Sequence, residues 1–298
     1  MIETLNVDWH TKYIALLVNV ASEAHTEGAQ SVLLAHRQGF DTATDLTILL
    51  PIIDQRLISA RTVELLDYND IYYSFLIKTD DLIECKLQLI HPATAQHIAK
   101  YRKQCRRFVA ETPDLYARIT MSYIDRQAAH RIRWIDNILS GASEQDRVII
   151  KKEGLDGFVI LPDCKWNQKA ISSLYLLALI NRRDVRSLRD LTSEHLPMLK
   201  DLKNTIAEIV PRQYAELEAC QLRVYIHYLP TYYYFHVHIV HVDLETPGCH
   251  AGTAHLLDDV IDNIENVASD YYQKRTLHYI LGVEHELYQL LQRSECHR

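Results

Sequence analysis

Two histidines, His236 and His238, lie two residues apart in an apolar stretch late in the chain. The β-branched and aromatic residues around them predict a strand over residues 233–242. Because side chains alternate between the faces of a strand, the two imidazoles share one face with Tyr234, roughly 6–7 Å apart. The other face carries residues expected in a core, Phe235, Val237, Ile239 and His241.

A third histidine, His227, lies on a second predicted strand, over residues 222–229, and would approach the pair through a tight turn at Pro230 and Thr231. The cluster has three interpretations. It could bind a metal ion, although no Cys or carboxylate stands at a helpful spacing to complete a site. It could be structural, with each ring paired inside a half-buried sheet. We favour acid–base or nucleophilic chemistry near pH 7, where imidazole titrates.

The composition of the 298 residues is that of a soluble globular protein of one or two domains. A formal net charge of −7 argues against non-specific binding to long nucleic acids, but permits a small anion in a basic pocket. The first ten residues show no secretory signal, and no apolar run is long enough to span a membrane. The six cysteines form no C-x-x-C pair, so we expect reduced thiols in the cytosol or nucleus.

The elements that must position the histidines form two blocks. In the first, residues 13–21 and 45–53 are apolar runs, residues 56–66 have helical spacing, and residues 72–78 and 83–90 predict strands. Apolar residues three or four apart then predict one long amphipathic helix over residues 94–111. Such a helix could be a hinge between two domains or could pack inside a single core.

The second block alternates helices and strands. Helices are expected over residues 129–139, 168–181, 193–209 and 254–267. Strands are expected over residues 147–150, 157–161, 222–229, 233–242 and 275–283. Thr192 or Ser193 would cap the third helix, with Glu194 in its first turn.

The alternation of histidine and apolar residues at 236–239 resembles the motif of the histidine triad (HIT) superfamily of nucleotide hydrolases and transferases. Further segments resemble, in order, the scavenger mRNA decapping enzyme family of that superfamily. They are Asn69–Tyr72, His91–Tyr101, Asp156–Gln168, Arg186–Pro197, Arg223–His238, Ala254–Leu257 and Tyr272–Leu277. The resemblance extends over residues 69–291 and is weaker before them.

The resemblance implies an α+β fold. An N-terminal mixed domain, residues 1–100 with the start of the hinge helix, would join a C-terminal HIT domain, residues 101–298, that contains an antiparallel sheet. Members of the family are homodimers whose N-terminal domains exchange between subunits and close over one active site at a time. The helix predicted at residues 94–111 fits such a hinge.

The resemblance also implies a reaction. Family members hydrolyse 7-methylguanosine cap dinucleotides (m7GpppN) and short capped RNAs left by 3′-to-5′ mRNA decay, releasing 7-methyl-GMP and a nucleoside diphosphate. His236 would attack the phosphorus nearest the methylated nucleoside and form a covalent nucleotidyl-histidine, without a metal or another cofactor. His238 and His227 would flank the phosphates. Splitting one displacement into two lowers each barrier, and a neutral imidazole is a good nucleophile at pH 7.

Matching positions also imply a binding site for the cap. Trp134 would stack on the positively charged base, and Glu144, helped by the Pro162 carbonyl, would accept from the guanine donors. Other residues that would contact the ligand are Asp163, Cys164, Lys165, Thr231 and Tyr232 in the second block, and Asn69, Tyr72, Lys100 and Tyr101 in the first block and hinge. Without the resemblance, Trp134 is more typical of a core residue and Glu144 of a solvated helix start.

Three positions depart from the family pattern. Tyr234 stands in place of the first triad histidine and supplies no charge near pH 7. Cys164 replaces a larger apolar residue against the base, which would weaken its stacking. Thr253 replaces an arginine near the phosphates, which would lower phosphate affinity.

These departures leave two alternatives to an active decapping enzyme. One is a weakly active or inactive cap-binding paralogue, and the other is a HIT hydrolase that acts on different nucleotides. The joint presence of His236 with Trp134 and Glu144 favours the decapping enzyme. We expect a cytoplasmic protein with a nuclear pool, with no membrane and no long nucleic acid as partner.

Overall fold

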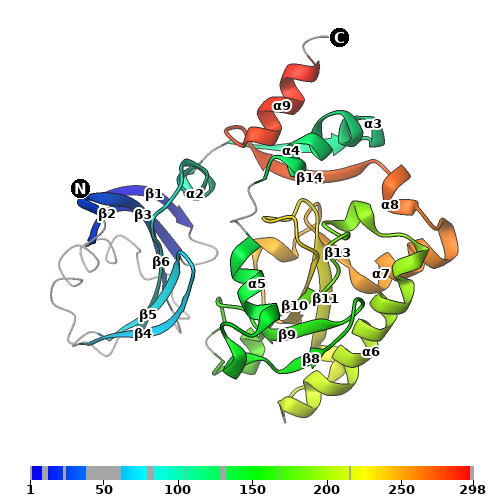
Figure 1. The fold of residues 1–298 in the computed structure, drawn as a ribbon, viewed down its shortest axis with the longest axis horizontal. Coiled ribbons are helices and arrows are strands. Elements are labelled where there is room, and N and C mark those ends of the chain that lie inside the picture. Colours follow the sequence, from blue (N-terminus) through cyan, green and yellow to red (C-terminus); the bar gives the residue numbers. More distant parts are fainter. Residues whose placement is uncertain are drawn as a thin grey trace. The chain divides into compact units, whose positions relative to one another are not determined.

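The computed structural model describes residues 2–8, 13–22, 25–37, 62–78, 84–103, 105–127, 132–166, 168–214 and 216–295. The chain divides into two compact units, residues 1–105 and residues 106–298 (Figure 1). Both units combine helices with antiparallel sheets. Within the described residues, no helix combines the length and the apolar character that crossing a bilayer requires.

In the described part of the first unit, one antiparallel sheet has the strand order β1-β2-β3-β6-β5-β4. Its elements are β1 (Ile2–Asp8), β2 (Tyr13–Ser22), β3 (His25–Arg37), β4 (Thr62–Asn69), β5 (Tyr72–Lys78), β6 (Glu84–Ile90) and the helix α2 (Ala95–Tyr101). The Thr94 hydroxyl caps α2 by accepting from the His97 backbone N–H, so the helix begins there. Ile98 and Tyr101 of α2 pack on the buried sheet residues Val32 and Leu34.

The long hinge helix predicted over residues 94–111 is wrong. The helix α2 ends at Tyr101, and residues 106–111 form strand β7 (Arg106–Glu111), which pairs with β14 (Leu277–Gly282). Phe108 stands opposite Ile280 in that pairing, a contact that helical spacing cannot reveal. Residues 62–66 of the predicted helix at 56–66 belong to β4, and residues 56–61 and the run at 45–53 lie outside the described residues.

The second unit contains a sheet of strand order β13-β11-β12-β10-β9-β8 and the β7–β14 pair. The sheet strands are β8 (Ile150–Lys152), β9 (Phe158–Pro162), β10 (Tyr175–Ile180), β11 (Leu222–His227), β12 (His236–His241) and β13 (Ala254–Leu256). The helices are α3 (Pro113–Leu115), α4 (Met121–Asp125), α5 (Arg133–Ser140), α6 (Leu196–Gln213), α7 (Leu257–Asp262), α8 (Tyr271–Lys274) and α9 (Glu286–Glu295).

Helices cover both faces of this sheet (Figure 1). On one face, Ile135 and Ile138 of α5 pack against Leu177 and Leu179 of β10. On the other face, α6 and α7 pack against the larger core, which includes Phe235, Val237 and Ile239. The predicted division of β12 into two faces is therefore confirmed, because Phe235 and its alternate neighbours lie in the core away from α5.

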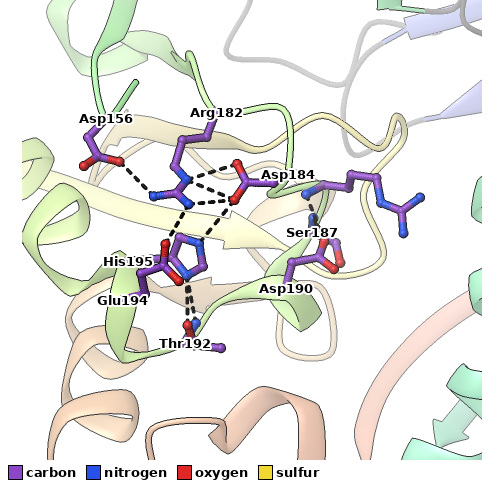
Figure 2. A network of polar contacts seen from close by, with 9 residues as sticks. Asp156, Arg182, Asp184, Ser187, Asp190, Thr192, Glu194 and His195 are labelled. Atoms are coloured by element: carbon purple, nitrogen blue, oxygen red, sulfur yellow. Dashed lines mark hydrogen bonds and ion pairs between the residues drawn. The ribbon is translucent and has the colours of Figure 1, made fainter. Parts of the chain in front are cut away.

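The helix predicted over residues 168–181 is also wrong, because residues 175–180 form β10 and are buried without exception. A strand buried on both faces has a continuous apolar run, which periodicity cannot distinguish from a buried helix. The chain turns immediately after β10 at Arg182, whose guanidinium lies between Asp156, Asp184 and Glu194 (Figure 2).

Smaller differences concern element ends. Residues 145–147 form a 3₁₀ turn and the strand begins at Ile150, where a strand was predicted over residues 147–150. The helix predicted over residues 254–267 begins as the short strand β13 and continues as α7. The third predicted helix is confirmed as α6, preceded by a 3₁₀ turn that Thr192 caps.

Candidate active site

Three histidine rings meet beside the centre of the sheet. His236 and His238 lie on β12 directly opposite Leu179 and Leu177 of β10, and are 4% and 5% exposed. His227 ends the neighbouring strand β11. The ring centroids of His227 and His238 are 4.0 Å apart, and those of His236 and His238 are 4.9 Å apart. The structure thus brings together the three histidines, while their chemical roles stay predictions.

Each imidazole has one nitrogen held by a protein oxygen. His236 Nδ1 lies 2.7 Å from the Tyr234 carbonyl oxygen, and His227 Nε2 lies 3.0 Å from the Gly248 carbonyl oxygen. A carbonyl only accepts, so these nitrogens carry the protons, and the lone pairs of the neutral rings are on His236 Nε2 and His227 Nδ1.

His238 is held differently. Its Nδ1 lies 3.0 Å from the Tyr175 hydroxyl, and its buried Nε2 has no hydrogen-bond partner among the described residues. Since an unsatisfied buried polar atom is costly, a ligand that pairs with this nitrogen would gain free energy on binding.

The electrostatics of the cluster keep the rings neutral. Burial lowers the pKa of His236 to about 4. Burial, followed by repulsion from His236, lowers the pKa of His227 to about 3, and burial with repulsion from His227 and His236 takes the pKa of His238 well below its ordinary value. The Lys165 ammonium also lowers all three pKa values, so a cation acts on the cluster from nearby.

The same rings fit a metal ion. One nitrogen from each of His227, His236 and His238 lies within 4.8 Å of the others. A metal-ligating histidine usually donates its second ring N–H to an oxygen, and the carbonyl contacts of His236 and His227 have that form. A site of three histidines is also typical of catalytic zinc. The absence of a metal therefore stays a prediction that an experiment with a chelator must test.

Aromatic rings extend from the cluster to α5. The Tyr232 ring stacks on His236 with centroids 4.3 Å apart and 23° between the planes. The half-buried Trp134 of α5 meets Tyr232 edge-on at 5.2 Å. Thr231, next to Tyr232, is exposed. The structure thus places Trp134, Tyr232 and His236 in one continuous aromatic wall.

Tyr234, which replaces the first triad histidine, directs its hydroxyl to the backbone of β10. It is 3% exposed, and its hydroxyl donates to the Ile180 carbonyl at 2.5 Å. Burial raises its pKa to about 12, so the hydroxyl keeps its proton at neutral pH. Its backbone carbonyl, by contrast, orients His236. Thr253, another departure, contributes a backbone carbonyl that accepts from the Tyr228 N–H at 2.8 Å.

The predicted acceptors of the base lie at the ends of β9 and of a 3₁₀ turn. The Glu144 side chain is 10% exposed, and its Oε2 lies 2.5 Å from Arg147 Nη1. Arg147 Nη2 also donates to the Pro162 carbonyl oxygen at 2.9 Å. Sequence reasoning missed Arg147, although the spacing of three residues between a glutamate and an arginine is a signal for such a pair.

The predicted ligand contacts that follow Pro162 occupy one turn. The Asp163 backbone N–H donates to the Tyr175 carbonyl at 2.9 Å, and its Oδ1 accepts from the Lys165 N–H at 2.8 Å. Cys164 and Lys165 are exposed. Lys165 Nζ lies 5.0 Å from the centre of the Tyr175 ring, which itself contacts His238. The turn therefore presents a cation beside the histidine cluster.

The remaining candidates belong to the first unit. Asn69 is buried and Tyr72 is 39% exposed, at the two sides of the β4–β5 hairpin. Tyr101 and Lys100 lie at the end of α2. The Tyr72 ring meets the His97 ring of α2 edge-on at 6.3 Å, so the hairpin and α2 lie close together within this unit. Contact between these residues and a ligand stays a prediction.

Comparisons with known proteins show the family of this chain. The chain matches the N-terminal family of the scavenger mRNA decapping enzyme (DcpS) over residues 1–104, and the family described as scavenger mRNA decapping enzyme C-term binding over residues 133–254. It is 34% identical over 293 residues to the m7GpppX diphosphatase of Schizosaccharomyces pombe, covering 96% of this chain and 92% of the relative.

Mammalian relatives bear the same name. The chain is 40% identical over 248 residues to the m7GpppX diphosphatase of Mus musculus, covering 83% of this chain and 72% of the relative. It is also 40% identical over 245 residues to that of Homo sapiens, covering 82% and 72%. With both halves matched in order, the chain belongs to the scavenger mRNA decapping enzyme family.

Proposed function

We propose that this protein is an active scavenger decapping hydrolase, which cleaves m7GpppN and short capped RNAs to 7-methyl-GMP and a nucleoside diphosphate. The family and the name shared by the relatives, m7GpppX diphosphatase, support this activity. The observation that carries the chemistry is the state of His236. Its ring is neutral, its Nδ1–H is held by the Tyr234 carbonyl, and its lone pair is on Nε2.

In the first step, His236 Nε2 attacks the phosphorus bound to the methylated nucleoside. An N–P bond forms, the P–O bond to the next phosphate breaks, and the nucleoside diphosphate leaves with the bonding electrons. The ring becomes an imidazolium, and the Tyr234 carbonyl stabilises the positive charge at Nδ1–H. In the second step, water attacks the same phosphorus and releases a proton to the solvent, the electrons of the N–P bond return to His236 Nε2, and 7-methyl-GMP leaves.

His238 and Lys165 stabilise the phosphates during both steps, and His227, whose N–H is held by the Gly248 carbonyl, flanks them. In this proposal the Tyr175 hydroxyl, 3.0 Å away, donates to His238 Nδ1, so the ring proton is on Nε2 and this N–H donates to a phosphate oxygen. The Lys165 ammonium, which already acts on the three rings, adds positive charge. On this proposal the transfer needs no metal ion, which the chelator experiment below tests.

The methylated base binds at the other end of the aromatic wall. Trp134 stacks on the cationic ring, and Glu144 with the Pro162 carbonyl accepts from the guanine N1–H and N2–H₂. Asp163, Cys164, Thr231 and Tyr232 line the path from base to phosphates. The support for this assignment is that Trp134 contacts Tyr232, which stacks on the nucleophile.

A second part of the proposal concerns the first unit. The protein forms a homodimer with exchanged N-terminal domains in this proposal. Four residues of the first unit close over the ligand and exclude water from the first step, the transfer to His236. They are Asn69, Tyr72, Lys100 and Tyr101. Such closure would also limit the length of the capped RNA. Light scattering should give twice the mass of one chain, and a monomeric, fully active protein would contradict this part. A third part of the proposal concerns localisation. The protein acts in the cytoplasm and nucleus, which fractionation of cells would test.

The function is tested by hydrolysis of m7GpppG and GpppG with EDTA present, with products separated by chromatography. We expect 7-methyl-GMP and GDP, with strong preference for the methylated substrate. Tight binding without turnover would instead indicate an inactive cap-binding paralogue. Equal turnover of both substrates would indicate another HIT hydrolase. Loss of activity in EDTA, restored by Zn²⁺, would favour the metal interpretation of the three histidines.

A further inference from the structure

Arg147 bridges the two acceptors to which the proposed function assigns the guanine base. Its Nη1 lies 2.5 Å from Glu144 Oε2, and its Nη2 lies 2.9 Å from the Pro162 carbonyl oxygen. The Arg147 and Glu144 side chains are only 17% and 10% exposed. Because water and salt screen such a shielded ion pair only weakly, the electrostatic attraction between its charges is stronger than in an exposed pair.

The local fold explains why one side chain reaches both acceptors. Glu144 has a left-handed backbone, with φ of 55°, and begins the 3₁₀ turn that ends at Arg147. A spacing of three residues places the two side chains on the same side of that turn. The Ile149 N–H then donates to the Ile160 carbonyl at 2.9 Å, which holds the turn beside β9 and its last residue, Pro162.

Each contact with Arg147 uses one acceptor site of its partner. A carboxylate has about four such sites and a carbonyl has two lone pairs, so the bridge alone does not saturate either acceptor. A guanidinium is planar and always charged, so its two amino groups fix the separation and orientation of the two oxygens. Guanine presents N1–H and N2–H₂ on one edge, which requires two acceptors held in a fixed relation.

We propose that Arg147 is a positioning residue for recognition of the guanine edge: it aligns the Glu144 carboxylate with the Pro162 carbonyl before the base binds. This inference rests on the proposed function, because that function assigns the two acceptors to the base. Arg147 itself does not contact the ligand. Its removal should therefore weaken recognition of the guanine donors and leave stacking and phosphate binding in place.

The test measures the dissociation constants of 7-methyl-GMP and 7-methylinosine monophosphate, which lacks the N2 amino group, for the full chain. Arg147→Ala should weaken binding of 7-methyl-GMP about 10-fold, because a misaligned Glu144 carboxylate loses one charge-assisted hydrogen bond to the guanine edge. Binding of the inosine analogue should weaken about 3-fold or less, because this ligand lacks the N2 amino group. Arg147→Lys keeps the charge but reaches one acceptor, so its loss should be intermediate. Arg118→Ala is the matched control, since it breaks an exposed Arg–Asp pair, with Asp114 at 2.7 Å, away from the site.

A double-mutant cycle shows whether Arg147 acts through Glu144. In the Glu144→Gln background, Arg147→Ala should add less than about a 2-fold loss, because the carboxylate that it aligns is already gone. Fully additive losses would mean direct contact with the ligand and would overturn the positioning role. Equal losses for the two nucleotides, or tighter binding by Arg147→Ala, would overturn it as well.

The outcomes separate this inference from the proposed function. If the wild-type protein binds 7-methyl-GMP no better than GMP, the proposed function fails. If the wild type prefers the methylated nucleotide and the Arg147 variants retain that affinity and the discrimination against inosine, only the inference fails. Thermal unfolding of each variant checks folding, and Arg147→Lys carries the test if Arg147→Ala does not fold.

Discussion

The second unit buries two polar clusters and satisfies them to different degrees. In the first, Arg189 and Glu111 are both fully buried, and Arg189 Nη2 lies 2.9 Å from Glu111 Oε1. Arg189 Nη1 donates to the carbonyls of Tyr272 and Arg275, and Nε donates to Glu111 Oε1. Glu111 also accepts from the hydroxyls of Thr120, Tyr228 and Tyr279. Every charge in this cluster is paired.

The histidine cluster is buried to a similar degree but is incompletely paired. His238 Nε2 has no partner among the described residues, and the proposed function uses the lone pair of His236 Nε2 for attack on phosphorus. The comparison teaches that complete pairing gives a rigid structural anchor, whereas incomplete pairing leaves groups that can react or bind. The two clusters are linked through the chain, because Tyr228 immediately follows His227.

Replacing the nucleophile should have the largest effect on activity. His236→Asn should lower kcat for m7GpppG at least about 1,000-fold, because no other group can form the covalent intermediate. Binding of 7-methyl-GMP and thermal stability should change little. Steady-state kinetics and fluorescence titration check both, with Arg118→Ala, which breaks an exposed pair with Asp114, as the control. A variant with full turnover would show that His236 is not the nucleophile.

Breaking the paired cluster should have the largest effect on stability. Arg189→Met leaves the Glu111 carboxylate buried without its cation, which should cost about 3–5 kcal/mol in the free energy of unfolding. Urea unfolding measures this loss, and kcat of the protein that remains folded should stay close to the wild-type value. If kcat fell with unchanged stability, the contrast between an anchor and a reactive cluster would be wrong.

Acid should lower the stability of the fold through the buried histidine cluster. Its folded-state pKa values, about 4 for His236 and about 3 for His227, lie below the unfolded value near 6.5. The unfolded chain therefore binds more protons as the pH falls below about 6.5, so stability is lost with acid. For His236 this loss is about 2 kcal/mol between pH 7 and pH 5.

Urea unfolding at pH 7 and pH 5 measures whether the free energy of unfolding falls with acid. His236→Asn should show a smaller loss between the two pH values than the wild type, and an equal loss would contradict the assigned pKa. The acid limb of kcat/KM, which reports the free enzyme, should fall near pH 4 and not near 6.5.

The smallest effect is expected at a third network, that of Arg182 (Figure 2). The Arg182 side chain is 9% exposed, but its partners Asp156, Asp184 and Glu194 are 55–71% exposed. Water screens such pairs, so Asp184→Ala should cost about 1 kcal/mol or less, with two carboxylates remaining. The loss should shrink further in 1 M salt. A cost close to that of Arg189→Met would mean that exposure does not decide the strength of these networks.

Local patterns predicted much of the site. Period-two alternation placed His236 and His238 on one face, and spaced segments indicated the family that the comparisons confirm. Local patterns failed where long-range pairing decides the structure. Residues 175–180 resemble a buried helix but form the centre of a sheet, and Phe108 has helical spacing but pairs with Ile280. Long-range pairing depends on two distant segments, so the residue pattern of one segment does not reveal its partner.

The sequence by itself therefore determined the histidine pair on one strand face, because this depends on short-range periodicity, and its resemblance to a known family indicated that family and implied the candidate residues for the cap. Only the tertiary structure decided which nitrogen of each ring is held, how far burial lowers the pKa of His236, and that Arg147 reaches both Glu144 and Pro162. The physical reason is that hydrogen-bond partners and desolvation are contributed by segments that are distant in the chain and adjacent only after folding.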